Sequence, residues 1–340
     1  MENKDKLLEV KDLRTYFDTR RGLAKAVDGV TFDLYKGETL GIVGESGCGK
    51  SITSLSILNL VPQPRGKIYG GEILLHRDND EIVDIAKLKR TGKKMKDIRR
   101  KDTAMIFQDP MSSLSPVYTV GSQIMEGIML SHDVSKKEAR QRAVEMLRKV
   151  GISPAEQRIN DYPYQLSGGM NQRAMIAVAL ASNPSLLIAD EPTTALDVTV
   201  EAQILELMEE LQQEFKMSIM FISHDLDVIG EISDRVVVMY TGKVVEVAEV
   251  EELFYNPSHP YTQGLLQSIP KIGRKTDLNP ISGSVPQIYN LPDACHFAPR
   301  CPHRMDICTK EEPPAFELGE GHQAKCWLYG EEEGGKKNER

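Results

Sequence analysis

The sequence lacks any long hydrophobic run. Among its 340 residues the richest apolar window, Met175 to Ala181, is short and rich in alanine, whereas a membrane-spanning helix needs about 20 apolar residues. The first residues carry charges where a secretory signal would need an apolar core. We therefore expect a soluble chain that stays in the cytoplasm, which is a reducing compartment.

An excess of positive charge is also missing. The formal net charge is −8, which argues against a general nucleic-acid binder. One segment departs from this balance, since Lys87 to Lys101 holds nine Lys and Arg in fifteen residues. Charge runs of this kind are usually solvated, so we interpret it as a connecting segment and expect no nucleic-acid partner.

Apolar patterning predicts an α/β core over the first 250 residues. Alternating apolar residues from Leu8 to Leu13, followed by the run Val27 to Leu34, indicate an antiparallel edge ribbon. Three short apolar runs fit buried parallel strands: Thr39 to Val43, Leu186 to Ala189 and Ser218 to Ile222. Three segments have helical patterns: Lys50 to Leu60, Val117 to Val150 and Val200 to Phe215. We expect Val117 to Val150 to form an all-helical insert.

A phosphate-binding loop follows the first of these parallel strands. Gly44 to Ser51 fits G-x-x-x-x-G-K-[ST] and lies between a predicted strand and a predicted helix, as this motif requires. In such a loop backbone N–H groups surround the β-phosphate, Lys50 neutralises the β- and γ-oxygens, and Ser51 ligates Mg²⁺. The nucleotide-binding residues expected here are Gly44, Ser46, Gly47, Cys48, Gly49, Lys50, Ser51 and Ile52. Cys48 is expected to face away from the phosphates, and we assign it no chemistry.

Two carboxylates follow the apolar run at Leu186. Asp190 is predicted to hold Mg²⁺ through its water shell. Glu191 is predicted to orient or deprotonate the attacking water, as a carboxylate within hydrogen-bond distance of a nucleophile can. An acidic pair after a strand is often structural, but its occurrence with a phosphate-binding loop in the same chain favours catalysis.

Motifs between and after these elements resemble those of ABC ATPases. Leu166 to Gln172 resembles the signature motif LSGGQ, with Met170 where that pattern has Gln. By the same resemblance Gln108 is identified as the Q-loop glutamine, Ala195 to Asp197 as the D-loop, and His224 as the switch histidine. The resemblance implies a P-loop NTPase core of the ABC ATPase kind, with a RecA-like subdomain, an antiparallel β subdomain and a helical insert. It assigns residues 1–250 to this domain and residues at about 112–172 to the helical subdomain.

The resemblance also implies roles for single residues. Ser167, Gly168 and Gly169 would form a second phosphate cradle that faces the P-loop of a partner subunit, so that ATP lies between two chains arranged head to tail. Gln108 would sense Mg²⁺ and couple it to the helical insert, and His224 would stabilise the charge of the γ-phosphate in the transition state. The adenine would stack on an aromatic residue at the end of the first strand, for which Phe17 is preferred and Tyr16 is the alternative.

The tail at residues 251–340 is rich in proline, and little helical or strand period survives there, so it needs another source of order. Four cysteines, Cys295, Cys301, Cys308 and Cys326, lie at spacings of five, six and seventeen residues. In a cytosolic protein such clustering indicates a metal site before disulfides. The spacing lacks the C-x₂-C pairs of structural zinc sites and is tolerated by a four-thiolate iron–sulfur cluster.

The tail resembles that of oligopeptide and dipeptide transporter ATPases. The resemblance rests on Asn256 to Thr262, with the sequence NPSHPYT, and on the pattern Cys-x-Phe-x-Pro-Arg-Cys-Pro at Cys295 to Pro302. Since such cysteines bind a [4Fe–4S] cluster in several members, the resemblance implies a structural cluster in an irregular, Cys-rich extension. Zn²⁺ as the bound metal and thiols without any metal stay open as alternatives. Three histidines near the cysteines are interpreted as bystanders: His296, His303 and His322.

Taken together, the resemblance implies an ATP-hydrolysing subunit that powers import of di- or oligopeptides. Its expected partners are two transmembrane permease subunits, a second ABC ATPase that is either identical or different, and indirectly an extracytoplasmic substrate-binding protein. Its expected location is the cytoplasmic face of the cell membrane, as a peripheral protein. Nickel, glutathione and oligosaccharide stay open as cargo, because other subunits read the cargo. A soluble ABC protein acting on ribosomes or DNA is the second class, but such proteins usually carry two cassettes or a long coiled coil, and this chain has neither.

Overall fold

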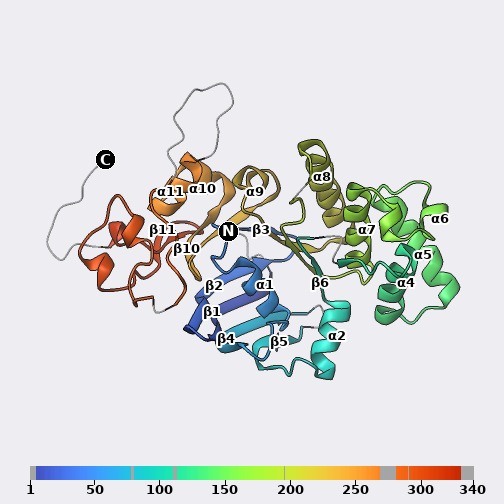
Figure 1. Ribbon diagram of the computed structural model, residues 1–340, viewed down its shortest axis with the longest axis horizontal. Coiled ribbons are helices and arrows are strands. Elements are labelled where there is room, and N and C mark those ends of the chain that lie inside the picture. The colour runs from blue at the N-terminus through green and yellow to red at the C-terminus, as the bar shows by residue number, and fades with distance from the viewer. Residues whose placement is uncertain are drawn as a thin grey trace.

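A computed structural model gives the structure of the chain and describes residues 5–77, 80–109, 113–194, 196–268, 281–289 and 291–330. Its strands are β1 (Lys6–Thr19), β2 (Gly22–Tyr35), β3 (Thr39–Val43), β4 (Gly66–His76), β5 (Ile82–Asp84), β6 (Thr103–Ile106), β7 (Leu186–Asp190), β8 (Ser218–Ile222), β9 (Arg235–Tyr240), β10 (Lys243–Glu249), β11 (Phe316–Gly319) and β12 (His322–Ala324). They form a four-stranded sheet, β2-β1-β4-β5, and an eight-stranded sheet, β11-β12-β10-β9-β3-β8-β7-β6 (Figure 1).

The α-helices join and cover these sheets. They are α1 (Lys50–Ile57), α2 (Lys93–Lys101), α4 (Val120–Ser131), α5 (Lys136–Lys149), α6 (Ala155–Arg158), α7 (Gly168–Leu180), α8 (Val198–Phe215), α9 (Leu226–Ile232), α10 (Val250–Tyr255) and α11 (Pro260–Gln267). In Figure 1 the green helices α4 to α7 lie at one end of the molecule and the orange and red C-terminal elements at the other. Among the described residues no helix is both long and apolar enough to cross a membrane.

The three predicted parallel strands are confirmed at the centre of the large sheet. All residues of β3, β7 and β8 are buried, which is expected of parallel strands covered on both faces. β3 pairs in parallel with β8, and β8 with β7. In this register Ile42 lies opposite Ile222, and Ile222 opposite Asp190. The segments that follow the three strands therefore emerge at the same edge of the sheet.

The ribbon and the helical insert are confirmed as well. β1 and β2 form a long antiparallel pair, and β4 and β5 extend it on the side of β1. In the insert, Thr119 caps the N-terminus of α4 and Ser135 that of α5, and each of these side chains accepts a hydrogen bond from the helix backbone. The apolar faces of both helices join a core cluster with α7, which ties the insert to the sheet.

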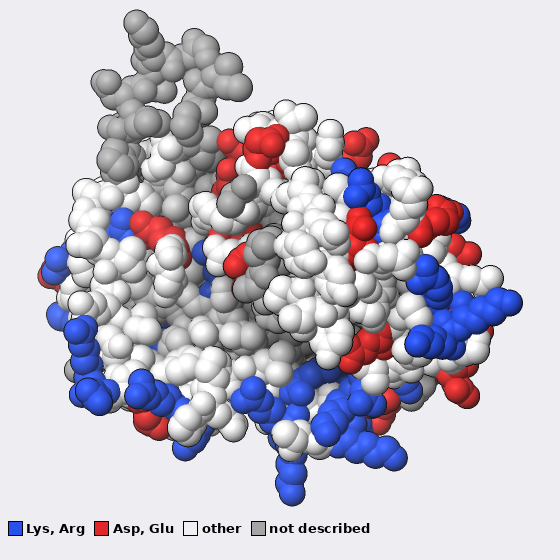
Figure 2. Space-filling model, turned by 45° about the vertical axis from the view of Figure 1, so that its right-hand side comes forward, with Lys and Arg blue, Asp and Glu red and all other residues white. Residues whose placement is uncertain are grey.

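The basic run is not a connecting segment, contrary to the prediction. Much of it forms α2, which follows a short 3₁₀ helix at Ile85–Lys87. Met95 and Ile98 of α2 are fully buried and anchor the helix, while most of its lysines and arginines remain at the surface. Lysine and arginine gather along the lower edge of Figure 2, on the side where α2 lies in Figure 1. The sequence pattern concealed this helix because two apolar residues are enough to anchor it.

The C-terminal tail has more regular structure than predicted. β12 pairs with β10, and β11 with β12, so the tail continues the large sheet beyond the cassette core. Three aromatic side chains meet beneath it: the ring of Tyr240 lies 4.7 Å from that of Tyr261 and 5.3 Å from that of Phe297. A buried pair adds to this order, since Nε2 of His322 lies 2.8 Å from Oε1 of Glu246. Apolar packing and buried hydrogen bonds therefore order the tail.

We predict that the aromatic cluster carries a large share of the tail's stability. Phe297 is only 2% exposed, so Phe297→Ala removes a buried ring and should lower the free energy of unfolding by about 3–5 kcal/mol. Tyr255→Ala is the control, because Tyr255 is 83% exposed and its loss should cost less than about 0.5 kcal/mol. Urea denaturation of both variants measures the difference, and equal midpoints would contradict the prediction.

His259 makes the folded state sensitive to acid. Complete burial lowers its pKa from 6.5 to about 3, so the folded protein holds this ring neutral. Stability from this residue is full above about pH 6.5 and is lost as the pH falls towards 3, because only the unfolded chain then binds the proton.

The free energy of unfolding should therefore fall by up to about 1.4 kcal/mol per pH unit between about pH 6 and pH 4 on account of this group. His259→Asn keeps a residue suited to begin α11 and should show a shallower slope over this range. His303→Asn replaces an exposed histidine and should keep the slope of the unaltered protein. Denaturant titrations across this range test both, and an unchanged slope in His259→Asn would refute the assignment.

Candidate functional site

The loop between β3 and α1 has the backbone of a phosphate cradle. Gly44 has a φ of 151°, and a Cβ there would lie 2.1 Å from the carbonyl oxygen of Met239. Gly49, directly before α1, has a φ of 107°, and a Cβ there would lie 2.4 Å from the carbonyl oxygen of Ala26. Only glycine fits at either position, so the motif's glycines serve close packing of the loop.

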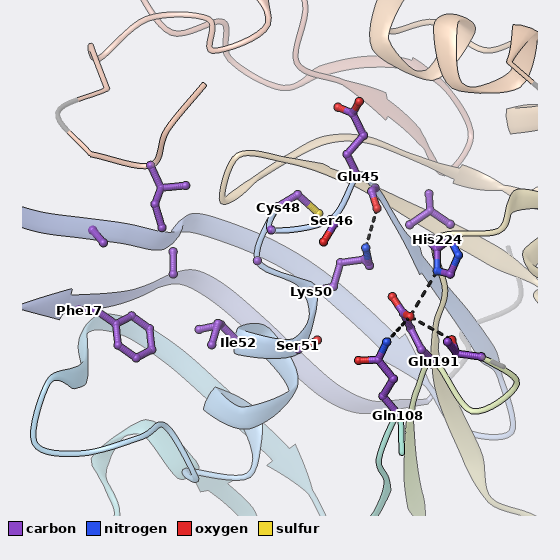
Figure 3. A pocket seen from close by; sticks show the side chains of 18 of the residues that line it. Phe17, Glu45, Ser46, Cys48, Lys50, Ser51, Ile52, Gln108, Glu191 and His224 are labelled. Atoms are coloured by element: carbon purple, nitrogen blue, oxygen red, sulfur yellow. Dashed lines mark hydrogen bonds and ion pairs between the residues drawn. The ribbon is translucent and has the colours of Figure 1, made fainter. Parts of the chain in front are cut away.

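The loop borders a cavity of about 930 Å³. Every predicted nucleotide-binding residue from Gly44 to Ile52 lines it, as do Phe17, Gln108, Glu191 and His224. Figure 3 shows these side chains converging from separate elements. Lys50 is buried, and its Nζ donates a hydrogen bond of 2.5 Å to the carbonyl oxygen of Gly44. The ammonium group of Lys50 therefore lies at the edge of the cavity, bonded to the backbone of its own loop.

The side chain of Cys48 packs into an apolar cluster, although the residue also borders the cavity. It is buried, it belongs to the apolar cluster under the antiparallel sheet, and burial raises the pKa of its thiol. A neutral thiol in an apolar environment has little reactivity.

The side-chain oxygens of Ser51 and Asp190 lie together beside the cavity. The hydroxyl of Ser51 donates to Oδ1 of Asp190 at 3.1 Å. Burial raises the pKa of Asp190, while the hydrogen bond from Ser51 acts in the opposite direction. A hydroxyl and a carboxylate at this distance suit Mg²⁺, which takes oxygen ligands and would neutralise the buried charge.

Glu191 is the meeting point of three other side chains. Its Oε2 accepts hydrogen bonds from Nε2 of Gln108 at 2.9 Å and from the hydroxyl of Thr194 at 3.0 Å. Nδ1 of His224 lies 3.3 Å from the same oxygen. The backbone of Glu191 has a φ of 50°, and its N–H donates to the carbonyl oxygen of Ile222 on β8. This strained backbone turns the carboxylate into the cavity, as Figure 3 shows.

The two residues of β1 considered for stacking on adenine, Tyr16 and Phe17, lie on opposite sides of the strand. Phe17 lines the cavity. Tyr16 is buried on the other side of the strand, where its hydroxyl donates to Oδ1 of Asp28 at 2.5 Å and its ring stacks on Tyr69. Successive residues of a strand point to opposite faces, so only one of the two can face the cavity. The geometry therefore favours Phe17.

The signature residues lie apart from this cavity. Ser167 begins α7, and its hydroxyl accepts a hydrogen bond from the N–H of Met170. Ser167 and Gly168 are exposed, and a Cβ at Gly168 would meet nothing within 4 Å. The side chain of Met170 packs against the core, so its difference from the usual Gln leaves the exposed backbone amides unchanged. This helix start is an open surface within one chain.

The segment identified as the D-loop is described only in part. Ala195 lies outside the described residues, while Leu196 packs against the core and Asp197 begins α8. The side chain of Asp197 accepts a hydrogen bond from the N–H of Val200 at 3.0 Å.

Several residues around the cavity were missed by the sequence analysis. Thr194 stands in no motif quoted above, although its distance of three residues from Glu191 after a strand was a usable signal. Leu265, Ile288 and Tyr289 line the cavity from the C-terminal tail. The N–H of Lys25 donates to the carbonyl oxygen of Ile288, which ties this part of the tail to β2. No local pattern in the sequence indicated that contact.

The predicted iron–sulfur cluster is wrong, and so is zinc as its alternative. All four cysteines belong to the described residues, and no three or more His, Cys, Asp and Glu among those residues are grouped so as to hold a metal ion. Burial raises the pKa of Cys295 to about 11 and that of Cys326 to about 12. The clustering of Cys295, Cys301, Cys308 and Cys326 reflects a packed tail.

Two of the three histidines near the cysteines are buried and take part in hydrogen bonds. His296 Nδ1 lies 2.8 Å from the hydroxyl of Thr241, and His322 contacts Glu246 as described above. His303 is exposed. His296 and His322 contribute to the packing of the tail.

Known proteins match both parts of the chain. Residues 27–194 match the family model described as ABC transporter, and residues 245–308 match that described as oligopeptide/dipeptide transporter, C-terminal region. The oligopeptide transport ATP-binding protein AppD of Bacillus subtilis is 54% identical, with 98% of this chain and 99% of that protein covered. The dipeptide transport ATP-binding protein DppD of the same organism is 47% identical, with 95% of each chain covered.

A solved structure agrees with these relatives. The dimeric ATP-binding cassette MJ0796, in a post-hydrolysis state bound to ADP and Pi, is 28% identical to this chain with a TM-score of 0.62. The match covers 72% of this chain and 99% of the cassette. Fold, cavity and relatives agree, and the chain belongs to the ABC transporter family, among the ATP-binding proteins of oligopeptide and dipeptide transport.

Proposed function

We propose that this chain binds and hydrolyses ATP to energise import of di- or oligopeptides through a multisubunit ABC transporter. The observation that carries the proposal is the convergence of Lys50, Ser51 and Glu191 on one cavity, the first two from the start of α1 and the third from the end of β7. The match of residues 245–308 to the oligopeptide/dipeptide transporter family supports the peptide cargo.

ATP would lie in the cavity with its phosphates on the loop from Gly44 to Ser51 and its adenine against Phe17. Lys50 would leave the carbonyl oxygen of Gly44 to neutralise the β- and γ-oxygens, because a buried ammonium gains more from a phosphate than from a carbonyl. Ser51 and Asp190 would hold Mg²⁺, and Gln108, which lines the same cavity, would sense the ion. When bound, the ion neutralises charge on the β- and γ-oxygens.

Glu191 would act as the base that orients or deprotonates the attacking water. Its Oε2 is held by Gln108, Thr194 and His224, so the carboxylate keeps one direction before the water arrives. His224 is 60% exposed at the cavity mouth, where its ring would reach the γ-phosphate and stabilise the charge that develops there.

Ser167, Gly168 and Gly169 would serve a second ATP molecule, one bound to a partner ATPase. The start of α7 is exposed and unobstructed, and exposed backbone amides at a helix start attract anions. Two chains arranged head to tail would then enclose ATP between the P-loop of one and the signature segment of the other. We infer further contacts with two membrane subunits, which places the chain at the cytoplasmic face of the membrane.

We further propose the division of the chain into an ABC ATPase domain, residues 1–250, and an extension, residues 251–340. The helical subdomain at about residues 112–172 would hold α4, α5 and α6. The extension adds β11 and β12 to the large sheet, so it shares a sheet with the domain it follows.

Replacing the proposed base tests the mechanism. Glu191→Gln keeps the shape of the side chain but cannot take a proton, so ATPase activity should fall at least about 100-fold while ATP binding persists. Phosphate release from the transporter assembled with its membrane subunits measures this. Glu210→Gln, on the exposed face of α8, is the matched control and should keep full activity. An unaltered rate in Glu191→Gln would remove Glu191 from the mechanism.

The signature cradle can be tested without disturbing the P-loop. Because a Cβ at Gly168 meets open space, Gly168→Asp should fold normally and place a negative charge where a second phosphate would bind. We expect the isolated chain to keep its Kd for ATP, while the assembled transporter loses at least about tenfold in ATPase rate. Gly168→Ala should keep most of the activity. Equal activity of the two variants would argue against the head-to-tail arrangement.

A further inference from the structure

Two segments of the C-terminal extension reach the P-loop from beneath. Tyr261 lies in the first turn of α11, within the segment Asn256 to Thr262. Arg300 ends a 3₁₀ helix, Ala298–Arg300, within the pattern from Cys295 to Pro302. These two segments distinguish the tail in the sequence, and the proposed reaction gives neither of them a role.

Arg300 holds the side chain of Glu45, the second residue of the P-loop. Its Nη1 donates to Oε2 of Glu45 at 2.6 Å and its Nη2 to Oε1 at 3.1 Å, which is a two-pronged pair. The side chain of Arg300 is 4% exposed, and the neighbouring Glu45 raises its pKa. Charge-assisted, paired hydrogen bonds of this kind fix direction as well as distance.

The remaining donors of Arg300 are also used. Nε donates to the carbonyl oxygen of Ser282 at 3.0 Å and Nη2 to that of Ile281 at 3.3 Å, while Nη1 reaches the hydroxyl of Tyr240 at 3.4 Å. The guanidinium group is therefore fixed by the extension and by β9 before it meets Glu45. Arg300 thus links the extension to the P-loop through hydrogen bonds to both.

Tyr261 holds the backbone at the same place. The N–H of Glu45 donates to the hydroxyl of Tyr261 at 2.8 Å. This N–H belongs to the same peptide unit as the carbonyl of Gly44, and that carbonyl accepts from Nζ of Lys50. Both polar groups of one peptide are thus bonded, one by the catalytic lysine and the other by the extension.

Tyr261 itself has no room to move. Its ring is fully buried against Tyr240 and Phe297. The turn that leads into α11 is fixed because the N–H groups of Ser258 and His259 donate to the carboxylate of Glu246. The hydroxyl therefore presents one fixed acceptor to the P-loop.

We propose that Tyr261 and Arg300 are positioning residues of the nucleotide site, through which the extension sets the affinity for ATP. They hold the peptide between Gly44 and Glu45 in the orientation that the loop needs when Lys50 transfers to the phosphates. A loop held in its binding geometry avoids the free-energy cost of ordering on binding, so ATP binds more tightly. The inference rests on the proposed function, because it assumes that the phosphates of ATP occupy this loop.

Removing one hydroxyl tests the backbone contact. Tyr261→Phe keeps the buried ring and leaves the N–H of Glu45 without its acceptor. We expect its Kd for ATP, measured by isothermal titration with the full chain and Mg²⁺, to rise about five- to tenfold. Tyr329→Phe is the matched control: it removes a hydroxyl that donates to the carbonyl oxygen of Ser258, also in the extension, and should leave the Kd unchanged.

A double-mutant cycle tests the ion pair. Arg300→Gln and Glu45→Gln should each raise the Kd for ATP about tenfold. The Kd of the double variant should be no higher than the higher Kd of the two single variants, because each single substitution already removes the same ion pair. Arg304→Gln, at an exposed arginine of the same extension, should leave the Kd unaltered. Tm is measured for every variant, so that loss of ATP affinity is separated from loss of stability.

The outcomes separate the two proposals. If the unaltered chain binds no ATP, the proposed function fails. If it binds ATP and Tyr261→Phe and Arg300→Gln bind equally well, the inference fails, even where their Tm falls, because the contacts then only stabilise the fold. Full additivity in the cycle would likewise overturn the action of Arg300 through Glu45.

Discussion

The parallel register of β7, β8 and β3 is the constraint on which the site depends. It brings the ends of three strands to one edge of the sheet, so that the P-loop, Glu191 and His224 share a single cavity although they are far apart in the sequence. Complete burial of these strands makes the register costly to shift. The positions of the reactive groups therefore follow from the packing of apolar side chains that take no part in the chemistry.

The C-terminal extension is joined to this arrangement at its most sensitive point. Beyond β10 it adds strands to the same sheet, and near the P-loop it supplies Arg300 together with Tyr261 and Phe297, whose rings pack against Tyr240 of β9. An ATPase loop with flexible glycines benefits from rigid neighbours, since each restrained peptide lowers the entropy lost when phosphates bind. On the proposed role of Tyr261 and Arg300, packing of the extension and binding of nucleotide would be coupled through these contacts.

The cysteines show how a sequence pattern can mislead. Their clustering in a proline-rich tail suggested that a metal replaces a missing core, but the tail has a core of its own, made of buried aromatic and apolar side chains and a buried His322–Glu246 pair. Cys308 and Cys326 are buried, and Cys295 and Cys301 pack against the core, which suits small apolar residues that fill space. Composition indicated correctly that the tail needed a source of order, but it could not tell packing from metal ligation.

The sequence by itself determined the α/β core, the strand–loop–helix at Gly44 to Ser51, the helical insert and the pairing of a P-loop with an acidic strand end, because these depend on local period and on motifs of adjacent residues. Only the tertiary structure decided which of Tyr16 and Phe17 faces the cavity, that Thr194 supports Glu191, that the basic run forms α2, and that Tyr261 and Arg300 hold the P-loop. These contacts join segments far apart in the chain or depend on which face a side chain takes. Their energies come from burial and register, which no local pattern records.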